Sequence, residues 1–292
     1  MPRVSATPRA SGSVTLRDGR LLAYAEWGDP AGRPVAMFHG NPATRLQCPD
    51  EDASAAAGVR LITVDRPGFG GSTPLPGRTL LSWADDYAEF HASLGLPPCP
   101  VMGWSAGGPY ALACAFAQPD IVTSVGVAGS VGPIDEVPEA YGDEMLGRAR
   151  LLGSDRPAAE AATVEGWASF VADPVSAYDG WFFNSPTPDG PDQRLYARPD
   201  VRAAMDEWAR DAARQGTAGV VSDSMVFLQP WGFSVADITR DAAVWVGDEA
   251  PADRLDSDYF AATIPGVTYV IYPGDGHLLT LPRWAEMLAW LH

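Results

Sequence analysis

The sequence predicts an α/β fold in which helices flank a parallel sheet and a helical segment interrupts it. Short apolar runs alternate with segments of helical spacing, which is typical of parallel strands joined by crossover helices. Residues 132–231, by contrast, form helix-like pieces broken by Pro and Gly, with no convincing buried strand. With 46% apolar residues among 292, the chain can bury a sizeable core.

The first part of the chain supplies the opening strands. SVTL and RLLAYAEWG are strand-like runs joined by the turn signal RDG, which predicts a hairpin. PVAMFHG and VRLITVDRPG are apolar runs that end in Gly- or Pro-rich loops, with a helix-like piece, CPDEDASAAAG, between them. Residues 79–95 then predict a helix, since apolar positions lie near helical spacing between Thr79 and Gly95.

The later elements complete the sheet. PCPVMGWSAGGPYALACAFAQPD is typical of a strand, a sharp turn and a helix, and IVTSVGVAGS of another buried strand. DAAVWVG and GVTYVIYPG resume the strand pattern, and RWAEMLAWLH predicts a closing amphipathic helix. We therefore expect residues 1–131 and 232–292 to form one core, and residues 132–231 to form a helical insertion.

Composition excludes several classes of function. The formal charge of −17 disfavours nucleic acid partners, because their phosphates would repel such a surface. The chain has no lysine, which removes a Schiff-base lysine, a P-loop and an anchor for PLP. Its three separated cysteines and four histidines favour neither a disulfide framework nor a zinc site. We expect no metal and no cofactor.

Location and partners follow from similar observations. No run approaches the roughly 18 apolar residues of a spanning helix, and the start of the chain lacks the apolar region of a secretory signal. We therefore expect a cytoplasmic protein that acts on a small molecule. We also expect no nucleic acid or membrane partner, and a monomer or homodimer.

The strongest motif is GWSAGG, which places Ser105 at the centre of a Gly-x-Ser-x-Gly sequence. The motif follows a predicted strand and precedes an alanine-rich helix, which is the context that a nucleophile elbow requires. In such a turn the serine is strained and small neighbours let the backbone pass. Ser105 is therefore a candidate nucleophile.

A serine nucleophile needs a base, and elimination among the four histidines names it. His39 directly follows an early strand, His91 lies inside a predicted helix rich in acidic residues, and His292 ends the chain. His277 lies in the Gly-rich loop PGDGHLL after the last predicted strand. This position matches the order serine, acid, histidine of one known triad arrangement.

The reaction also requires donors for the developing oxyanion. FHGNP ends the early strand at Phe38, so the backbone amide of Asn41 can face the space above Ser105. Ala106 follows the nucleophile at a helix N-terminus and supplies a second amide.

HGNP, DRPGFGGS, GWSAGG and PGDGHL, in this order and spacing, resemble the α/β-hydrolase superfamily. WGFSVADI and IPGVTYVIYPGDGHLL further resemble a bacterial branch of these hydrolases, mostly of unknown substrate. The resemblance implies an eight-stranded, mostly parallel sheet with a helical cap inserted after the sixth strand. It also implies Ser105 as nucleophile, His277 as base, and Asn41 and Ala106 as oxyanion donors. DRPGFGGS is then expected to be a structural loop in which Asp65 and Arg66 pair.

Some branches of the superfamily do not fit. HGNP also resembles haloalkane dehalogenases, but those enzymes and related epoxide hydrolases attack with an aspartate, where this chain has Ser105. Proline iminopeptidases are typified by an HGGPG loop and a GGSWG elbow, and this chain has neither motif. Hydrolysis of an ester, thioester or lactone remains.

The acid of the triad is the irregular part of the pattern. In the superfamily it follows the seventh strand as G-x-x-D, and counting from Gly247 gives Ala250. Counting back from the IPG segment gives Glu249, so the loop looks shortened and we expect Glu249, or as the alternative Asp248, to be the acid. Asp253 lies past a proline and ranks below both, and the absence of any functional acid stays open.

The insertion is rich in aromatic residues, and these suggest the roof of a substrate pocket. We expect Trp104, Trp181 and Phe182 to line that pocket. The sequence then supports a serine hydrolase for a small or medium, partly apolar substrate that forms an acyl-enzyme on Ser105. The alternative is a ligand-binding protein, lyase or cyclase on the same fold, which only the irregular acid loop favours.

Overall fold

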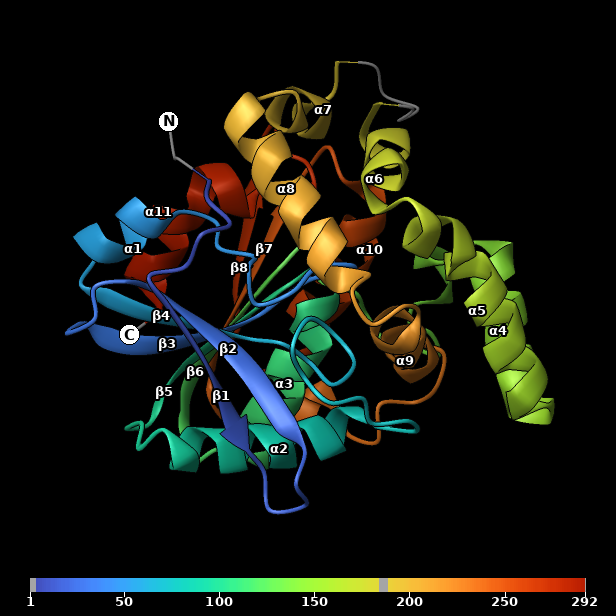
Figure 1. Ribbon diagram of the computed structural model, residues 1–292, viewed down its shortest axis with the longest axis horizontal. Coiled ribbons are helices and arrows are strands. Elements are labelled where there is room, and N and C mark those ends of the chain that lie inside the picture. The colour runs from blue at the N-terminus through green and yellow to red at the C-terminus, as the bar shows by residue number, and fades with distance from the viewer. Residues whose placement is uncertain (1–3, 184–188, 292) are drawn as a thin grey trace.

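The computed structural model describes residues 4–183 and 189–291, and within them eight strands form one sheet (Figure 1). The strand order is β1-β2-β4-β3-β5-β6-β7-β8. β2 pairs antiparallel with β1 and β4, and every other pair is parallel. The expected α/β fold and its opening hairpin are confirmed. The strands are β1 (Ala10–Thr15), β2 (Leu21–Gly28), β3 (Arg33–Phe38), β4 (Val59–Val64), β5 (Cys99–Trp104), β6 (Val122–Ala128), β7 (Asp241–Gly247) and β8 (Thr268–Tyr272).

Helices connect the strands and cover both faces of the sheet (Figure 1). The core helices are α1 (Glu51–Ala56), α2 (Leu80–Ser93), α3 (Gly108–Ala117), α10 (Pro251–Thr263) and α11 (Thr280–Trp290). Among the described residues between β6 and β7, six more helices follow one another: α4 (Asp143–Ser154), α5 (Arg156–Ala172), α6 (Pro174–Phe183), α7 (Pro191–Tyr196), α8 (Pro199–Ala212) and α9 (Ala218–Phe227). Short 3₁₀ helices are η1 (Ser105–Gly107), η2 (Pro138–Ala140) and η3 (Val235–Asp237).

The two faces of the sheet bury two separate sets of side chains, because successive residues of a strand point to opposite faces. In β3, Val35 and Met37 belong to the apolar cluster that includes α11, whereas Ala36 and Phe38 belong to the cluster that includes α2 and α3. All four residues are fully buried. This double coverage explains why the parallel strands have nearly continuous apolar sequences.

The parallel strands also place several loops at one edge of the sheet. The carboxyl ends of parallel strands meet at the same edge, which is where open α/β sheets bind ligands. The HGNP loop follows β3, Ser105 follows β5, and His277 comes after β8. Residues far apart in sequence thus come together at this edge.

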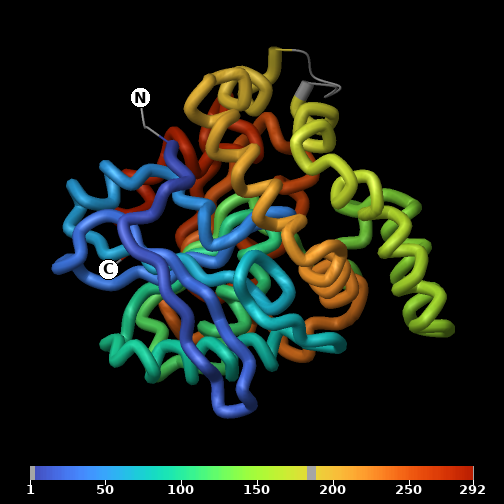
Figure 2. Tube along the Cα trace, viewed as in Figure 1, coloured from blue at the N-terminus to red at the C-terminus, as the bar shows by residue number. Residues whose placement is uncertain are grey.

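The insertion packs over that edge rather than forming a separate unit (Figure 2). Buried residues of α8 and α9 belong to the same apolar cluster as one face of the sheet. Trp208 of α8 meets Trp104 of β5 edge to face, with ring centroids 6.2 Å apart. The contact between the helices and the strand ends is therefore part of the hydrophobic core.

A buried charge cluster also ties the insertion to the core. Asp223 of α9 is fully buried and accepts hydrogen bonds from the guanidinium groups of Arg66 (2.5 Å) and Arg78, and from the Tyr110 hydroxyl (2.7 Å). The three donors come from the core, and their side chains are buried as well. Two cations thus share one carboxylate in the interior.

This arrangement corrects the expected pair of Asp65 with Arg66. Asp65 instead binds the guanidinium of Arg45 at 2.7 Å, while Arg66 turns to Asp223. Neighbouring residues of an extended chain point in opposite directions, so adjacency in sequence does not bring their side chains together.

Replacing Asp223 by alanine is expected to lower the free energy of unfolding by about 3–5 kcal/mol, because two buried guanidinium groups lose their counter-charge. Urea unfolding of the variant measures this loss. Glu207→Gln is the matched control in the insertion, since its pair with Arg210 is exposed and worth about 0–1 kcal/mol. Equal stability of the two variants would contradict the expectation.

Candidate active site

Ser105 lies on a sharp turn between β5 and α3. It has φ of +55°, which a residue with a side chain rarely adopts. The turn is tight enough to require glycine on both sides: a Cβ on Gly103 would lie 2.4 Å from the Gly107 carbonyl oxygen, and one on Gly107 would lie 2.0 Å from the Phe38 carbonyl oxygen. The local sequence thus forces Ser105 into a strained position at the edge of the sheet.

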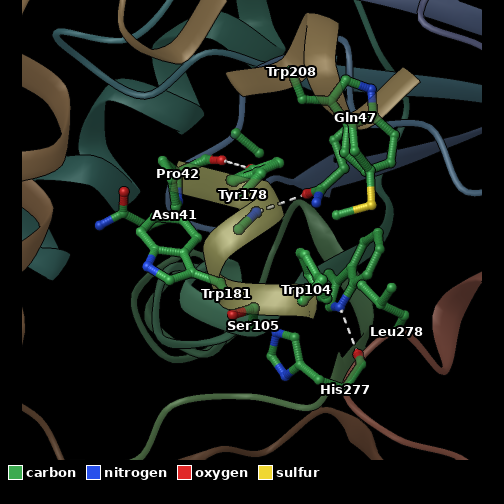
Figure 3. Close-up of a pocket in the computed structure, with 14 residues that line it drawn as sticks. Asn41, Pro42, Gln47, Trp104, Ser105, Tyr178, Trp181, Trp208, His277 and Leu278 are labelled. Atoms are coloured by element: carbon green, nitrogen blue, oxygen red, sulfur yellow. Dashed lines mark hydrogen bonds between the residues drawn. The ribbon is translucent and has the colours of Figure 1, made fainter. Parts of the chain in front are cut away.

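The Ser105 side chain faces a cavity of about 170 Å³ between the strand ends and the insertion (Figure 3). All three residues expected in a pocket, Trp104, Trp181 and Phe182, line it. The described lining residues are Gly40, Asn41, Pro42, Ala43, Gln47, Trp104, Ser105, Tyr178, Trp181, Phe182, Met205, Trp208, His277 and Leu278. Most of these side chains are apolar or aromatic, so the cavity suits an apolar group.

His277 enters the same cavity from the loop after β8, and Figure 3 shows its imidazole beside Ser105. Its Nδ1 lies 2.6 Å from Oδ2 of Asp253. Its carbonyl oxygen accepts a hydrogen bond from the indole N–H of Trp104 at 3.2 Å. A serine, an imidazole and a carboxylate therefore follow one another across the strand ends, as the order of a triad requires.

The contact with Asp253 corrects the expectation that Glu249 or Asp248 meets the imidazole. Glu249 is exposed, and Asp248 accepts a hydrogen bond from the Gly274 N–H at 2.6 Å. Helix α10 begins at Pro251 and places Asp253 in its first turn, facing His277. Proline is favoured at the first position of a helix, so Pro251 was the signal that sequence counting passed over.

The surroundings of His277 favour its charged form. Burial opposes the imidazolium, but the Asp253 carboxylate through its charge and hydrogen bond, together with the charge of Asp192, raises the pKa of His277 to about 9. The imidazole still keeps 35% of its surface exposed, so it remains accessible from the cavity.

His39 has the opposite environment. It is buried, and burial together with the positive charge of Arg66 lowers its pKa well below the ordinary value. Its Nδ1 lies 2.7 Å from the Gly40 carbonyl oxygen, and its Nε2 accepts from the Arg66 backbone N–H at 3.2 Å. These two bonds fit a neutral ring with a structural part in the loop.

The two expected oxyanion donors belong to the segments that follow β3 and β5. Asn41 follows β3 and lines the cavity, while Ala106 lies in η1, whose first N–H groups have no partner within the helix. The loop that carries Asn41 is held in place, since Arg66 donates to the Gly40 carbonyl (3.1 Å) and Gln47 accepts from the Gly40 N–H (2.7 Å). Both backbone amides thus lie on fixed segments near Ser105.

Two further properties concern residues 4–183 and 189–291. Within these ranges no group of three His, Cys, Asp or Glu side chains is placed to hold a metal ion. No helix in the same ranges is long and apolar enough to cross a membrane.

Comparisons with known proteins add two partial sequence matches. A proline iminopeptidase from Xylella fastidiosa is 30% identical over 133 residues, which cover 42% of this chain and 40% of that protein. A bifunctional esterase/perhydrolase from Acinetobacter calcoaceticus is 37% identical over 103 residues, which cover 33% and 36%. The chain thus spans less than half the length of these curated relatives.

Similarity over the whole chain is also found. The fold is similar to that of an alpha/beta hydrolase fold protein from Nakamurella multipartita, with a TM-score of 0.65 and 25% identity over 96% of this chain and 99% of that one. The model of the alpha/beta hydrolase family matches residues 20–290. Because this match covers nearly all of the sequence, the chain belongs to the alpha/beta hydrolase family.

Proposed function

We propose that this protein is a serine hydrolase that cleaves small, uncharged, partly apolar esters, thioesters or lactones. The observation that carries the proposal is that Ser105, on its strained turn, shares one cavity with an imidazole already bonded to a carboxylate. Serine is a weak nucleophile alone, and this arrangement is what activates it.

In the proposed reaction His277 takes the proton of Ser105 as its oxygen attacks the carbonyl carbon of the substrate. The backbone N–H groups of Asn41 and Ala106 stabilise the negative charge on the carbonyl oxygen. His277 then gives the proton to the leaving alcohol or thiol, which leaves an acyl group on Ser105. His277 then takes a proton from water as the water attacks the acyl group, and it returns the proton to Ser105 as the acid leaves. Asp253 orients the imidazole and stabilises its charged form throughout.

The size and polarity of the cavity support the substrate class. A cavity of about 150 Å³ lined by apolar side chains holds a molecule the size of benzene, and this one measures about 170 Å³. We infer an acyl group of about that size. Residues 132–231 would act as the cap, since Tyr178, Trp181 and Phe182 of α6 line the cavity that Ser105 faces.

A peptidase acting on an N-terminal proline is the second candidate, since a proline iminopeptidase is among the relatives. Such a substrate presents an ammonium group, and a buried cation needs a counter-charge. No described residue that lines the cavity is acidic. The lining therefore favours a neutral ester over an aminoacyl substrate.

A fluorophosphonate probe and three substrates test the proposal together. We expect covalent labelling of Ser105 and turnover of ethyl butyrate and a phenyl ester. We expect no release of p-nitroaniline from L-proline p-nitroanilide. Labelling with release from the anilide alone would identify a peptidase. Absence of both labelling and turnover would favour a non-hydrolytic protein, although the contact of Asp253 with His277 argues against an irregular acid.

The rate is expected to increase with pH, because only the neutral imidazole accepts the proton of Ser105. A pKa of about 9 leaves about one His277 in a hundred neutral at pH 7. The kcat/KM for ethyl butyrate should therefore rise about tenfold per pH unit from pH 6 and level off above pH 9. Titration of the released acid at constant pH measures it, with Ser105→Ala as the blank. A flat profile from pH 6 to 10 would contradict the expectation.

A further inference from the structure

A second carboxylate reaches the His277 loop, and it comes from the insertion. Asp192 in the first turn of α7 accepts a hydrogen bond from the His277 backbone N–H (2.9 Å) at Oδ2 and from the Leu278 N–H (2.8 Å) at Oδ1. The approach is close, since a Cβ on Gly276 would lie 2.5 Å from Oδ1 of Asp192. Gly276, which has no Cβ, therefore leaves the space that the Asp192 carboxylate occupies.

These bonds complete the fixation of His277. Asp192 holds its backbone N–H, Trp104 holds its carbonyl oxygen, and Asp253 holds its ring. Of the three anchors, only Asp192 belongs to the insertion. The same end of the insertion supplies Trp181 and Phe182 to the cavity.

We propose that Asp192 is a positioning residue that aligns His277, so that the imidazole faces Ser105 when α7 lies against the His277 loop. The proposal rests on the hydrolase function above, but it concerns how the insertion takes part in it. When α7 packs against the His277 loop, the insertion would then both cover the cavity and orient His277 as the base. A misplacement of about 1 Å in such a group costs on the order of 10²-fold in rate.

The charged groups around His277 come from several segments of the chain. Asp253 on α10 touches the ring, Asp192 on α7 touches the backbone, and Asp275 in the loop itself is paired with Arg283 of α11 at 2.6 Å. Glu249, on the loop before α10, is exposed. Removing the charge of Asp192 should therefore lower the pKa of His277 toward its ordinary value, because Asp192 is one of the two carboxylates that raise it.

Asp192→Asn and Asp192→Ala test this role against Glu249→Gln as matched control. The control removes a charge from the same region, where Glu249 and Asp192 line one small cavity. On the plateau above pH 9, where His277 is neutral, we expect kcat for ethyl butyrate to fall on the order of 10-fold to 100-fold in the alanine variant, with KM changed less than about threefold. The asparagine variant keeps one acceptor and should lie between. The midpoint of the pH profile should fall in both.

A readout without turnover separates this proposal from the hydrolase function. With ¹⁵N-labelled histidine, NMR follows the His277 titration among only four imidazoles. A lower His277 pKa in Asp192→Asn than in Glu249→Gln shows, even if no ester is cleaved, that the Asp192 carboxylate acts on His277, and the fall of kcat at unchanged KM then measures the alignment. Wild-type kcat and an unchanged His277 titration in a folded Asp192→Ala protein would overturn it.

Discussion

Ser105→Ala is expected to lower kcat for ester hydrolysis by at least about 10⁴-fold, since removal of a catalytic serine alone has nearly the effect of removing a whole triad. The oxyanion donors and the cavity would remain, so a small residual rate is compatible with the proposal. Rates of ethyl butyrate hydrolysis and labelling by the fluorophosphonate measure the loss. Alanine takes the same strained backbone, so the unfolding midpoint should change little.

Ser93→Ala is the control for this variant. Ser93 lies exposed on α2, its hydroxyl donates to the Glu89 carbonyl oxygen at 2.8 Å, and it is not among the described residues that line the cavity. It should keep wild-type rates and labelling. If the Ser105→Ala protein were still labelled or retained more than about a tenth of the rate, another nucleophile would have to be sought.

Asp253→Asn is expected to lower kcat on the plateau above pH 9 by about 10³–10⁴-fold while the fold is kept. An asparagine amide can donate to Nδ1 of His277, which would leave the proton on the nitrogen that should accept it from Ser105. The same change removes the main cause of the raised His277 pKa, so the pH midpoint should fall. Steady-state rates from pH 5.5 to 10 give both quantities.

Glu249→Gln and Asp248→Asn are the comparison variants, because these acids precede α10 in the same loop and neither contacts His277 in the structure. Both should keep kcat within about twofold. A loss of kcat in Glu249→Gln as large as that in Asp253→Asn would instead favour Glu249 as the acid of the triad.

Local patterns in the sequence were enough to predict the strands and the turn at Ser105. A buried strand and a glycine-flanked turn are encoded by neighbouring residues, as Gly103 and Gly107 illustrate, and the spacing alone identifies them. The position of His277 after β8 was likewise given by chain order. Trp104, expected from its place beside Ser105, and Trp181 and Phe182, expected from the aromatic residues of the insertion, all line the cavity.

The acid was harder to place because its position depends on where a helix begins. Counting from Gly247 treats the loop as extended, but the chain turns into α10 at Pro251 and brings Asp253 back toward β8. Asp192 was out of reach for another reason. Its hydrogen bonds join α7 to a loop 85 and 86 residues further along the chain, and no local pattern records such a contact.

The cluster around Asp223 affects how far this insertion can be exchanged between relatives. The segment between β6 and β7 is inserted in sequence, yet its Asp223 neutralises Arg66 and Arg78 inside the core. A chimera with a foreign insertion that lacks an acid at this place would contain two uncompensated charges next to the HGNP loop. A functional chimera therefore requires that Arg66, Arg78 and Asp223 be exchanged together, although they lie far apart in the sequence.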